Sequence, residues 1–363
     1  MLASKTTGVL RADMATIYNV AELAGVSAKT VSRVVNDDNA VKPATREKVL
    51  AAMQRLDYHP NAQARQLRLG LPSSVGFLLE DPTSGYQGRF HHAMLTACME
   101  TGKHLAVELY EPGMADWPAY LDRFIIDAQI RGMILLPTLC DFGPLKTFLK
   151  SRGIHCVLIS PSTPDSHYAS VAMDDRLAAR DVVEYLLRLG HTRIAHIGGH
   201  PDHAASILRR NGFYEAFDAN GLNRPSPDYM AHGDFSFKSG FQAAEHLLSL
   251  KDRPTAVFAC NDEMAAATCS VAHMKGLRIP HDLAIVGFDD APIASAVWPT
   301  LTTVRQPYLE MARRSIQIFG AETDVLRPSD RQVRHVIPHE IIERETTLSG
   351  NQGQLLLKSS NVS

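Results

Sequence analysis

The sequence predicts a small all-α headpiece followed by two doubly wound α/β subdomains with a cleft between them. Near the N-terminus, two short segments with the helical spacing of apolar residues meet at Gly25. From residue 74 onward, apolar runs typical of buried parallel strands alternate with amphipathic segments in about ten units, too many for one compact sheet. A chain of 363 residues, 45% of them apolar, is long enough for two or three units.

The first element is predicted to be a helix-turn-helix between Met14 and Asn36. Thr16 has the side chain of a helix N-cap, and apolar residues follow it at helical spacing. Gly25 can adopt the left-handed conformation that a sharp turn requires. Ser27 can cap the second helix. The residues of that helix that we expect to face inward are Val31, Val34 and Val35.

The outward face of the second helix has small, basic and hydroxylic side chains and no acid. It consists of Ala28, Lys29, Ser32 and Arg33. Arginine and lysine can hydrogen-bond to guanine edges in the major groove of DNA, and small hydroxylic side chains can contact phosphates. A surface hairpin that contacts nothing is the alternative. The coincidence of turn, cap and basic face favours a hairpin that reads DNA.

A third helix and a linker are expected next. Pro43 is well tolerated in the first turn of a helix. The apolar face of this helix consists of Val49, Met53 and Leu56. Residues 15–58 can therefore close a three-helix core. The following segment, 58–67, is polar except for Leu67, and sequence rules alone predict a short helix or a linker that packs on the core.

The body is predicted to contain parallel sheets with helices on both faces. Its apolar, strand-like runs are residues 74–80, 104–110, 132–137, 156–160, 170–174, 193–199, 256–260 and 283–289. Amphipathic segments separate them, with a clear helix over Leu177–Leu189. In such sheets ligands bind at the carboxyl ends of the strands. The last residues have no heptad pattern, which gives no support for a C-terminal coiled coil.

Polar residues follow several of these strands, where the cleft should lie. Among them are Asp81, Ser84, Tyr86, Gln87, Asp174, Asp175, Arg209, Asn261, Asp262, Asp289 and Asp290. Phe235 adds an aromatic ring. A ring that covers the apolar face of a sugar, together with carboxylate, amide and guanidinium groups, suits the recognition of a polyol. A strand-end cap or a helix N-cap is the alternative for each residue, and we expect Asp262 and Asp290 to be such caps.

Charge is distributed unevenly along the chain. Residues 1–70 have ten Lys/Arg against six Asp/Glu, whereas the remainder has 27 against 33. A basic headpiece on an acidic body suits nucleic-acid contact by the headpiece alone.

Other classes of site have little support. Five cysteines without CxxC spacing lie in or beside apolar runs, so we expect buried thiols in the cytoplasm, no zinc site and no other metal. No apolar stretch is long enough to span a membrane, and residues 1–13 lack a signal-peptide core. The motifs of serine hydrolases, P-loop enzymes and dinucleotide-binding enzymes are absent. We therefore expect no enzyme and no cofactor.

The segment 16–36, TIYNVAELAGVSAKTVSRVVN, closely resembles the DNA-binding domain of the lactose/galactose/purine repressor (LacI/GalR) family of bacterial transcriptional regulators. The pattern of that family is T-I-x-D-V-A-x-x-A-G-V-S-x-x-T-V-S-R-V-L/I-N. Asn19 replaces the usual aspartate, so we expect a weaker cap interaction there. Residues 58–67, YHPNAQARQL, match the hinge pattern Y-x-P-N-x-x-A-R-x-L of the family. The resemblance extends over nearly the whole chain.

The resemblance implies a homodimer that binds pseudo-palindromic operator DNA through two headpieces. The hinge would become helical on DNA, with Leu67 wedged between base pairs from the minor groove. The DNA-contacting residues that it implies are Thr16, Tyr18, Ser27, Ala28, Lys29, Thr30, Ser32, Arg33, Asn36, Asn61, Ala62, Ala64 and Leu67.

The resemblance also implies a body of the periplasmic-binding-protein type that controls operator affinity through a small molecule in its cleft, a sugar in our interpretation. The effector-binding residues expected are Tyr86, Gln87, Asp174, Arg209, Phe235, Asn261 and Asp289. A purine-responsive regulator of the same family is one alternative, because Phe235 could also stack on a base. A sugar-binding protein or enzyme that does not act on DNA is the other.

The domain boundaries follow from the same comparison. We expect a disordered extension at 1–13, the DNA-binding domain at 14–60, the hinge at 61–72, the body at 73–346 and a disordered tail at 347–363. Within the body, we assign about 73–171 and 304–328 to an N-subdomain, and about 172–303 and 329–346 to a C-subdomain.

Overall fold

The computed structural model describes residues 15–35, 38, 41–56, 58, 74–111, 113–163, 165–319 and 334–347. The chain forms two compact units, Met1–Leu71 and Pro72–Ser363. The extension expected at 1–13, the hinge at 61–72 and most of the tail lie outside the described residues.

The first unit is a three-helix headpiece. Its helices are α1 (Ile17–Ala24), α2 (Ala28–Val35) and α3 (Pro43–Arg55). Their shared core is Val20, Ala21, Val31, Val34, Val49 and Ala52. Thr16 and Asn19 form a complete capping box, in which the side-chain oxygen of Asn19 accepts from the Thr16 backbone N–H at 2.9 Å. The substitution of asparagine for aspartate at this position therefore preserves the cap.

The turn between α1 and α2 forms as the sequence predicts. Gly25 has a φ of 65°, in the left-handed region, and its N–H bonds to carbonyls of the last turn of α1. Ser27 then accepts the backbone N–H of Thr30 at 3.1 Å and caps α2.

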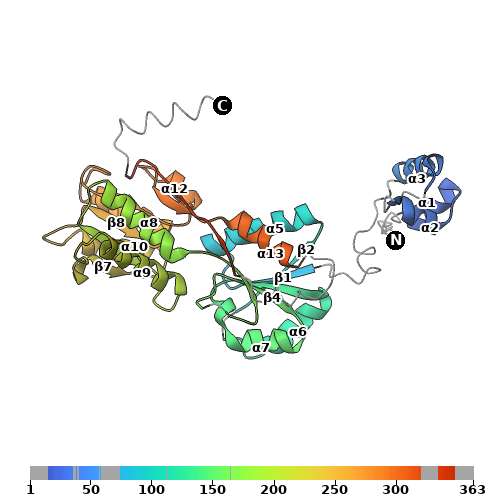
Figure 1. Ribbon diagram of the computed structural model, residues 1–363, viewed down its shortest axis with the longest axis horizontal. Coiled ribbons are helices and arrows are strands. Elements are labelled where there is room, and N and C mark those ends of the chain that lie inside the picture. The colour runs from blue at the N-terminus through green and yellow to red at the C-terminus, as the bar shows by residue number, and fades with distance from the viewer. Residues whose placement is uncertain are drawn as a thin grey trace, which may run out of the picture. The chain divides into compact units, whose positions relative to one another are not determined.

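The second unit begins with a six-stranded parallel sheet in the order β11-β5-β4-β3-β1-β2. Its strands are β1 (Ser74–Leu79), β2 (His104–Leu109), β3 (Ile130–Leu135), β4 (His155–Ile159), β5 (Ala169–Met173) and β11 (Arg334–Ile337). Four helices cover the two faces of this N-subdomain sheet, as Figure 1 shows: α5 (Gly85–Thr101) and α13 (Tyr308–Ile318) on one, α6 (Trp117–Asp127) and α7 (Gly143–Ser151) on the other.

A second parallel sheet, in the order β7-β6-β8-β9, forms the C-subdomain. Its strands are β6 (Ile194–Gly198), β7 (Met230–His232), β8 (Ala256–Ala259) and β9 (Ala284–Val286). Helices α8 (Asp175–Arg188) and α9 (Ala204–Ala219) pack on one face, and α10 (Phe237–Leu247) and α11 (Asp262–Met274) on the other. The body also contains three short helical segments, η1 (Leu139–Asp141), η2 (Pro227–Tyr229) and α12 (Pro292–Ala296).

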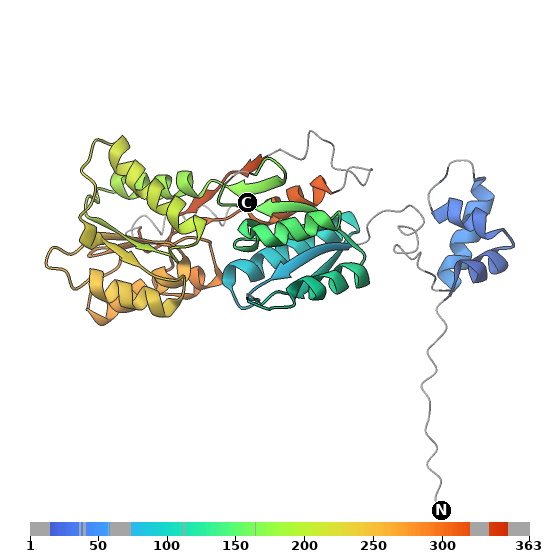
Figure 2. The same ribbon diagram turned by 90° about the horizontal axis from the view of Figure 1, so that it is seen from below.

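Extended segments link the two sheets (Figure 2). Strand β10 (Thr303–Arg305) pairs antiparallel with β12 (Glu340–Ile342), and β5 leads directly into α8. The chain thus passes between the subdomains three times within the described residues.

Two of the expected boundaries are wrong in detail. Strand β11 pairs with β5 in the N-subdomain sheet, although residues from about 329 to 346 were expected in the C-subdomain. A four-residue edge strand with alternating burial gives no sequence signal that identifies its sheet. Thr347, expected in the disordered tail, is 8% exposed, and its hydroxyl lies 2.8 Å from the Tyr185 hydroxyl.

Close packing of α9 on α8 depends on Gly212. A Cβ at this position would lie 2.0 Å from the backbone oxygen of Arg176 in α8. We predict that Gly212→Ala destabilises the body by about 1–3 kcal/mol, because the two helices must separate. Gly143→Ala in α7 is the matched control, since no atom lies within 4 Å of its added Cβ. Urea unfolding of both variants would measure the difference, and equal midpoints would contradict the prediction.

Candidate functional site

The predicted outward face of α2 is accessible. Lys29 and Arg33 are exposed, and Ala28, Thr30 and Ser32 are half-buried. Thr16, Tyr18 and Ser27 are also exposed, and Tyr18 is 70% accessible. The remaining residues expected on DNA, namely Asn36, Asn61, Ala62, Ala64 and Leu67, lie outside the described residues.

Arg33 has an acidic neighbour within the headpiece. Its Nε lies 3.7 Å from Asp38 Oδ2, and the two side chains are 53% and 38% exposed. An exposed ion pair at this distance contributes little to stability, so the guanidinium can exchange this partner for a base edge at little cost.

In the body, residues of both subdomains form a buried polar cluster. Arg89 of α5 lies 3.5 Å from Asp289 Oδ2, which follows β9, and donates to the Tyr308 hydroxyl of α13 at 3.0 Å. The Tyr86 ring meets the Tyr308 ring edge-on at 5.7 Å. The cluster therefore includes Tyr86 and Asp289, both predicted from the sequence.

Arg209 is fixed by a carboxylate that we had not assigned to the site. Its Nη2 lies 2.7 Å from Asp175 Oδ1 and its Nε 2.8 Å from the same oxygen, while Nη1 donates to the Cys260 carbonyl. The guanidinium carbon lies 3.5 Å from the centroid of the Phe288 ring. Burial opposes the charge, but the carboxylates of Asp175 and Asp289 raise the pKa of Arg209 above its usual value.

The carboxylate of Asp289 interacts with the guanidinium groups of both Arg209 and Arg89. Burial raises the pKa of its carboxyl, although Arg209 and Arg89 favour the ionised form. Oδ1 accepts from the Gln306 side chain. Its φ of 111° places a non-glycine residue in a strained region, which is common where a side chain is held for function.

Arg89 is the residue that sequence reasoning missed. Its Nε and Nη1 are buried and have no hydrogen-bond partner. Buried guanidinium N–H groups are costly to leave unpaired, so a ligand with acceptor oxygens fits here. Arg89 lies near the start of α5, and in a sequence an arginine at such a position resembles any exposed helical arginine.

The distal edge of the Phe235 ring lies against Gly199, directly after β6. A Cβ on Gly199 would stand 2.2 Å from the Phe235 ring, so only glycine permits this approach. His203 contributes a second ring, with centroids 5.4 Å apart. Asn261 donates to the Phe235 carbonyl at 2.8 Å, and Phe235 has a φ of 72°. The aromatic plate is thus held by its backbone from one side and by glycine from the other.

Three predicted residues have structural bonds of the kind that the alternative interpretation described. Asn261 accepts the backbone N–H of Met264 and caps α11, and Asp174 accepts that of Leu177 and caps α8. The Gln87 side-chain oxygen accepts backbone N–H groups of Glu80 at 3.0 Å and Asp81 at 3.1 Å. These bonds position the three side chains and leave each of them with fewer free hydrogen-bonding groups for a ligand.

Asp262 and Asp290 stabilise the fold around the cluster through tertiary hydrogen bonds and ion pairs, whereas the sequence predicted helix or strand-end caps; the cap of α11 is Asn261. Asp262 accepts from the Ala291 backbone N–H and the Thr303 hydroxyl, both at 2.6 Å. Asp290 pairs with Arg305 and Arg344.

No group of three or more metal-binding side chains occurs within the described ranges, and none of the helices described there is long and apolar enough to cross a membrane. The five cysteines are buried and free.

A helix-turn-helix headpiece with a basic outward face, joined in one chain to a two-subdomain α/β body with a buried polar cluster, defines a ligand-controlled DNA-binding regulator. Comparison with known proteins agrees. Residues 16–61 match the model of bacterial regulatory proteins of the lacI family, and residues 183–347 match the periplasmic binding protein-like domain.

Relatives extend this match to nearly the whole chain. The ribose operon repressor of Escherichia coli K12 is 33% identical over 332 residues, which cover 91% of this chain and 99% of the relative. A structure of the Lac repressor dimer bound to operator and the anti-inducer ONPF is 27% identical, with a TM-score of 0.73, and covers 92% and 99% of the two chains. The transcriptional regulator CelR in complex with cellobiose is 29% identical, with a TM-score of 0.67 and the same coverage. The chain belongs to the lacI family and is a DNA-binding transcriptional regulator.

The carboxyl of Asp262 should make stability depend on pH. Burial, with the nearby charge of Asp289, raises its pKa to about 8. The folded state then binds the proton more tightly than the unfolded state. The contribution of the protonated Asp262 carboxyl to the free energy of unfolding is therefore complete near pH 4 and is lost as pH rises toward 8. We predict that the free energy of unfolding falls from pH 5 to pH 8 by at least about 1 kcal/mol more in the native protein than in Asp262→Asn.

Urea unfolding of the two proteins at both pH values would measure this, and titrating groups that do not interact with Asp262 cancel in the difference. An identical pH dependence would show that Asp262 is ionised throughout.

Proposed function

We propose that the Arg89–Asp289 cluster of the body binds a small polyhydroxylated effector, a sugar, and that its binding controls the affinity of the headpieces for operator DNA. The observation that supports this best is the pair of buried, unpartnered N–H groups of Arg89 beside the Asp289 carboxylate. Adjacent donors and acceptors match the vicinal hydroxyls of a sugar, which donate and accept at neighbouring positions.

The surrounding residues suit the same ligand. Phe235 and His203 offer rings for the apolar face of a sugar. Arg209 keeps its orientation through Asp175 and needs no rearrangement to meet a ligand. Tyr86, Gln87, Asp174 and Asn261 complete the proposed set, the last three through bonds that shape the site.

A sugar is favoured over a purine. One related structure is a transcriptional regulator in complex with cellobiose, and another relative is named a ribose operon repressor. Phe235 could stack on a base, which keeps a purine-responsive regulator as the second candidate. The side-chain oxygen of Gln87 is engaged by two backbone N–H groups, so this residue offers a base only its remaining amide group.

On the DNA side, we propose that Ala28, Lys29 and Arg33 determine base preference. Thr16, Tyr18, Ser27, Thr30 and Ser32, with Asn36, would contact the backbone and position α2. A homodimer would place two headpieces on a pseudo-palindromic operator. The Lac repressor relative is a dimer bound to its operator.

The coupling would pass through the hinge. An effector that contacts Arg89 of the N-subdomain and Asp289 of the C-subdomain favours one arrangement of the subdomains. Strand β1 begins directly after the hinge, so that arrangement would decide whether Leu67, with Asn61, Ala62 and Ala64, can enter the minor groove. Two states with different affinities for effector and DNA suffice for control.

The reported relatives are transcription regulators, which supports this function over the alternatives of an enzyme or a binding protein that does not act on DNA. We propose that the protein acts in the cytoplasm, on the DNA of the nucleoid.

The DNA contact can be tested through Arg33. Arg33→Ala should relax specificity at one operator base pair, at a cost of about 1–3 kcal/mol for the preferred base. Arg55→Ala, which removes an exposed arginine of α3, is the control and should leave the preference unchanged. Footprinting upstream of the gene, followed by binding to operators varied at each position, would measure this. Equal weakening on all sequences would make Arg33 a phosphate contact.

The effector site can be tested through Asp289 and Arg89. Asp289→Ala should abolish the change in operator affinity on addition of the effector and leave DNA binding without effector intact. Arg89→Met should weaken effector binding by about tenfold or more, because hydrogen bonds to a charged group are lost. Arg123→Met, in an arginine 84% exposed on α6, is the control. A thermal-shift screen of sugars and purines would identify the ligand. An unchanged dose response in both variants would exclude this cluster as the site.

A further inference from the structure

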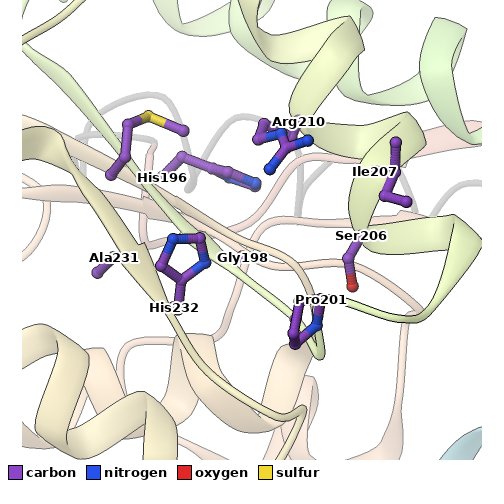
Figure 3. A pocket seen from close by; sticks show the side chains of 10 residues that line it. His196, Gly198, Pro201, Ser206, Ile207, Arg210, Ala231 and His232 are labelled. Atoms are coloured by element: carbon purple, nitrogen blue, oxygen red, sulfur yellow. The ribbon is translucent and has the colours of Figure 1, made fainter. Parts of the chain in front are cut away.

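A pocket lies in the C-subdomain, between the first turns of α9 and the edge strand β7 (Figure 3). The space inside it, open solvent included, is about 330 Å³. The polar side chains that surround it are His196, Ser206, Arg210 and His232, and no carboxylate lines it. None of these four residues belongs to the Arg89–Asp289 cluster.

Ser206 has a hydroxyl without a partner. The residue is 7% exposed, and its Oγ is buried with no hydrogen bond. Buried hydroxyls in other helices of this chain donate to the carbonyl four residues earlier, as Ser315 does to Met311 at 2.8 Å and Thr268 to Met264 at 2.8 Å. In the first turn of α9, Ser206 makes no such bond. A buried hydroxyl is costly to leave unpaired, so this one is available to a ligand.

Arg210 lies one helical turn after Ser206, on the same face of α9. It is exposed, and no carboxylate partner is found for it among the residues that the structure describes. Other exposed arginines nearby are paired: Arg176 with Glu215 at 3.0 Å, and Arg224 with Asp218. The guanidinium therefore gives the pocket a positive charge that no neighbouring acid neutralises.

Neither histidine brings a negative charge, and only His232 can add a donor to the pocket, because the single N–H of neutral His196 is used within the fold. Burial lowers the pKa of His196 to about 4, and the charges of Arg210 and His232 contribute to the same direction. The ring is therefore neutral at pH 7. Its Nδ1 donates to the Phe258 carbonyl at 3.0 Å, because a carbonyl can only accept. His232 faces it from β7 (Figure 3).

The N-terminus of α9 adds to the positive electrostatic potential of the pocket. His203, the N-cap residue, provides no side-chain cap, whereas the neighbouring helices α8, α10 and α11 are capped by Asp174, Ser236 and Asn261. The positive end of the helix dipole is thus not offset by a capping oxygen.

We propose that this pocket binds the carboxylate or phosphate group of a small organic anion, as a site separate from the effector site. Ser206 would donate its hydroxyl hydrogen to the anion, Arg210 would form the charged contact, and His232 would donate from the opposite wall. The same helix holds Arg209 in the effector cluster, next in sequence to Arg210. An anion that orders the first turns of α9 would therefore alter the affinity for the effector, and the effector would alter that for the anion by the same factor.

The test uses full-length protein with inorganic phosphate and, separately, succinate as probes, each against sodium chloride of equal ionic strength. We expect saturable binding of at least one probe by calorimetry, and the comparison shows whether phosphate or carboxylate is preferred. Arg210→Met should weaken it by about tenfold or more. Arg123→Met on the remote helix α6 should not change it.

Ser206→Ala separates a ligand contact from a structural role. Because the hydroxyl has no partner in the fold, its removal should leave the unfolding midpoint without anion unchanged or raise it, while it weakens probe binding several-fold. Absence of binding by both probes would overturn the proposal. So would binding that neither Ser206→Ala nor Arg210→Met weakens. Neither outcome depends on the effector site, because no sugar is present in the experiment.

Discussion

The buried pairing of Arg209 with Asp175 is the interaction on which the geometry of the body depends. It joins the start of α8 to α9 and, through the Cys260 carbonyl and the Phe288 ring, to the ends of β8 and β9. Two charges this deeply buried are tolerated only where each is fully hydrogen-bonded, so the surrounding backbone has few alternatives. Asp289 then lies in the field of Arg209, and Arg89 reaches it from the other subdomain.

The cluster is well ordered on one side and incomplete on the other. In the C-subdomain, Arg209, Asn261 and Asp262 have partners, and Phe235 and Asp289 are held in positive-φ conformations. From the N-subdomain, Arg89 brings two N–H groups that have none. A ligand that supplies the missing acceptors would bridge the subdomains, and that is the requirement for transmitting its presence to the hinge. The strained backbone at Phe235 and Asp289 and the unpaired N–H groups of Arg89 are thus explained together, because both prepare the cluster to bind a ligand.

Local rules succeeded where the cause of a structure lies within a few residues. The capping box of Thr16 and Asn19, the left-handed Gly25 and the inward valines of α2 formed as predicted, because helix ends and apolar spacing are decided by neighbours. The alternation of apolar runs likewise predicted two parallel sheets. Prediction was wrong for β11, a short edge strand whose sheet depends on a partner more than 160 positions earlier, Ser170 for Arg334. It was also wrong for Thr347, which is buried by contacts with Tyr185 and Thr302.

By itself the sequence determined the family, the two-unit organisation, the outward face of α2 and most of the polar residues at the strand ends. Each of these depends on residue order, which a long motif or a periodic pattern records directly. Only the tertiary structure decided which polar groups are satisfied: Asn261 and Gln87 are bound by backbone, Arg209 by Asp175, whereas Arg89 and Ser206 retain free donors in buried positions. Hydrogen-bond satisfaction depends on atoms far apart in the chain, and for that reason no sequence pattern can report it.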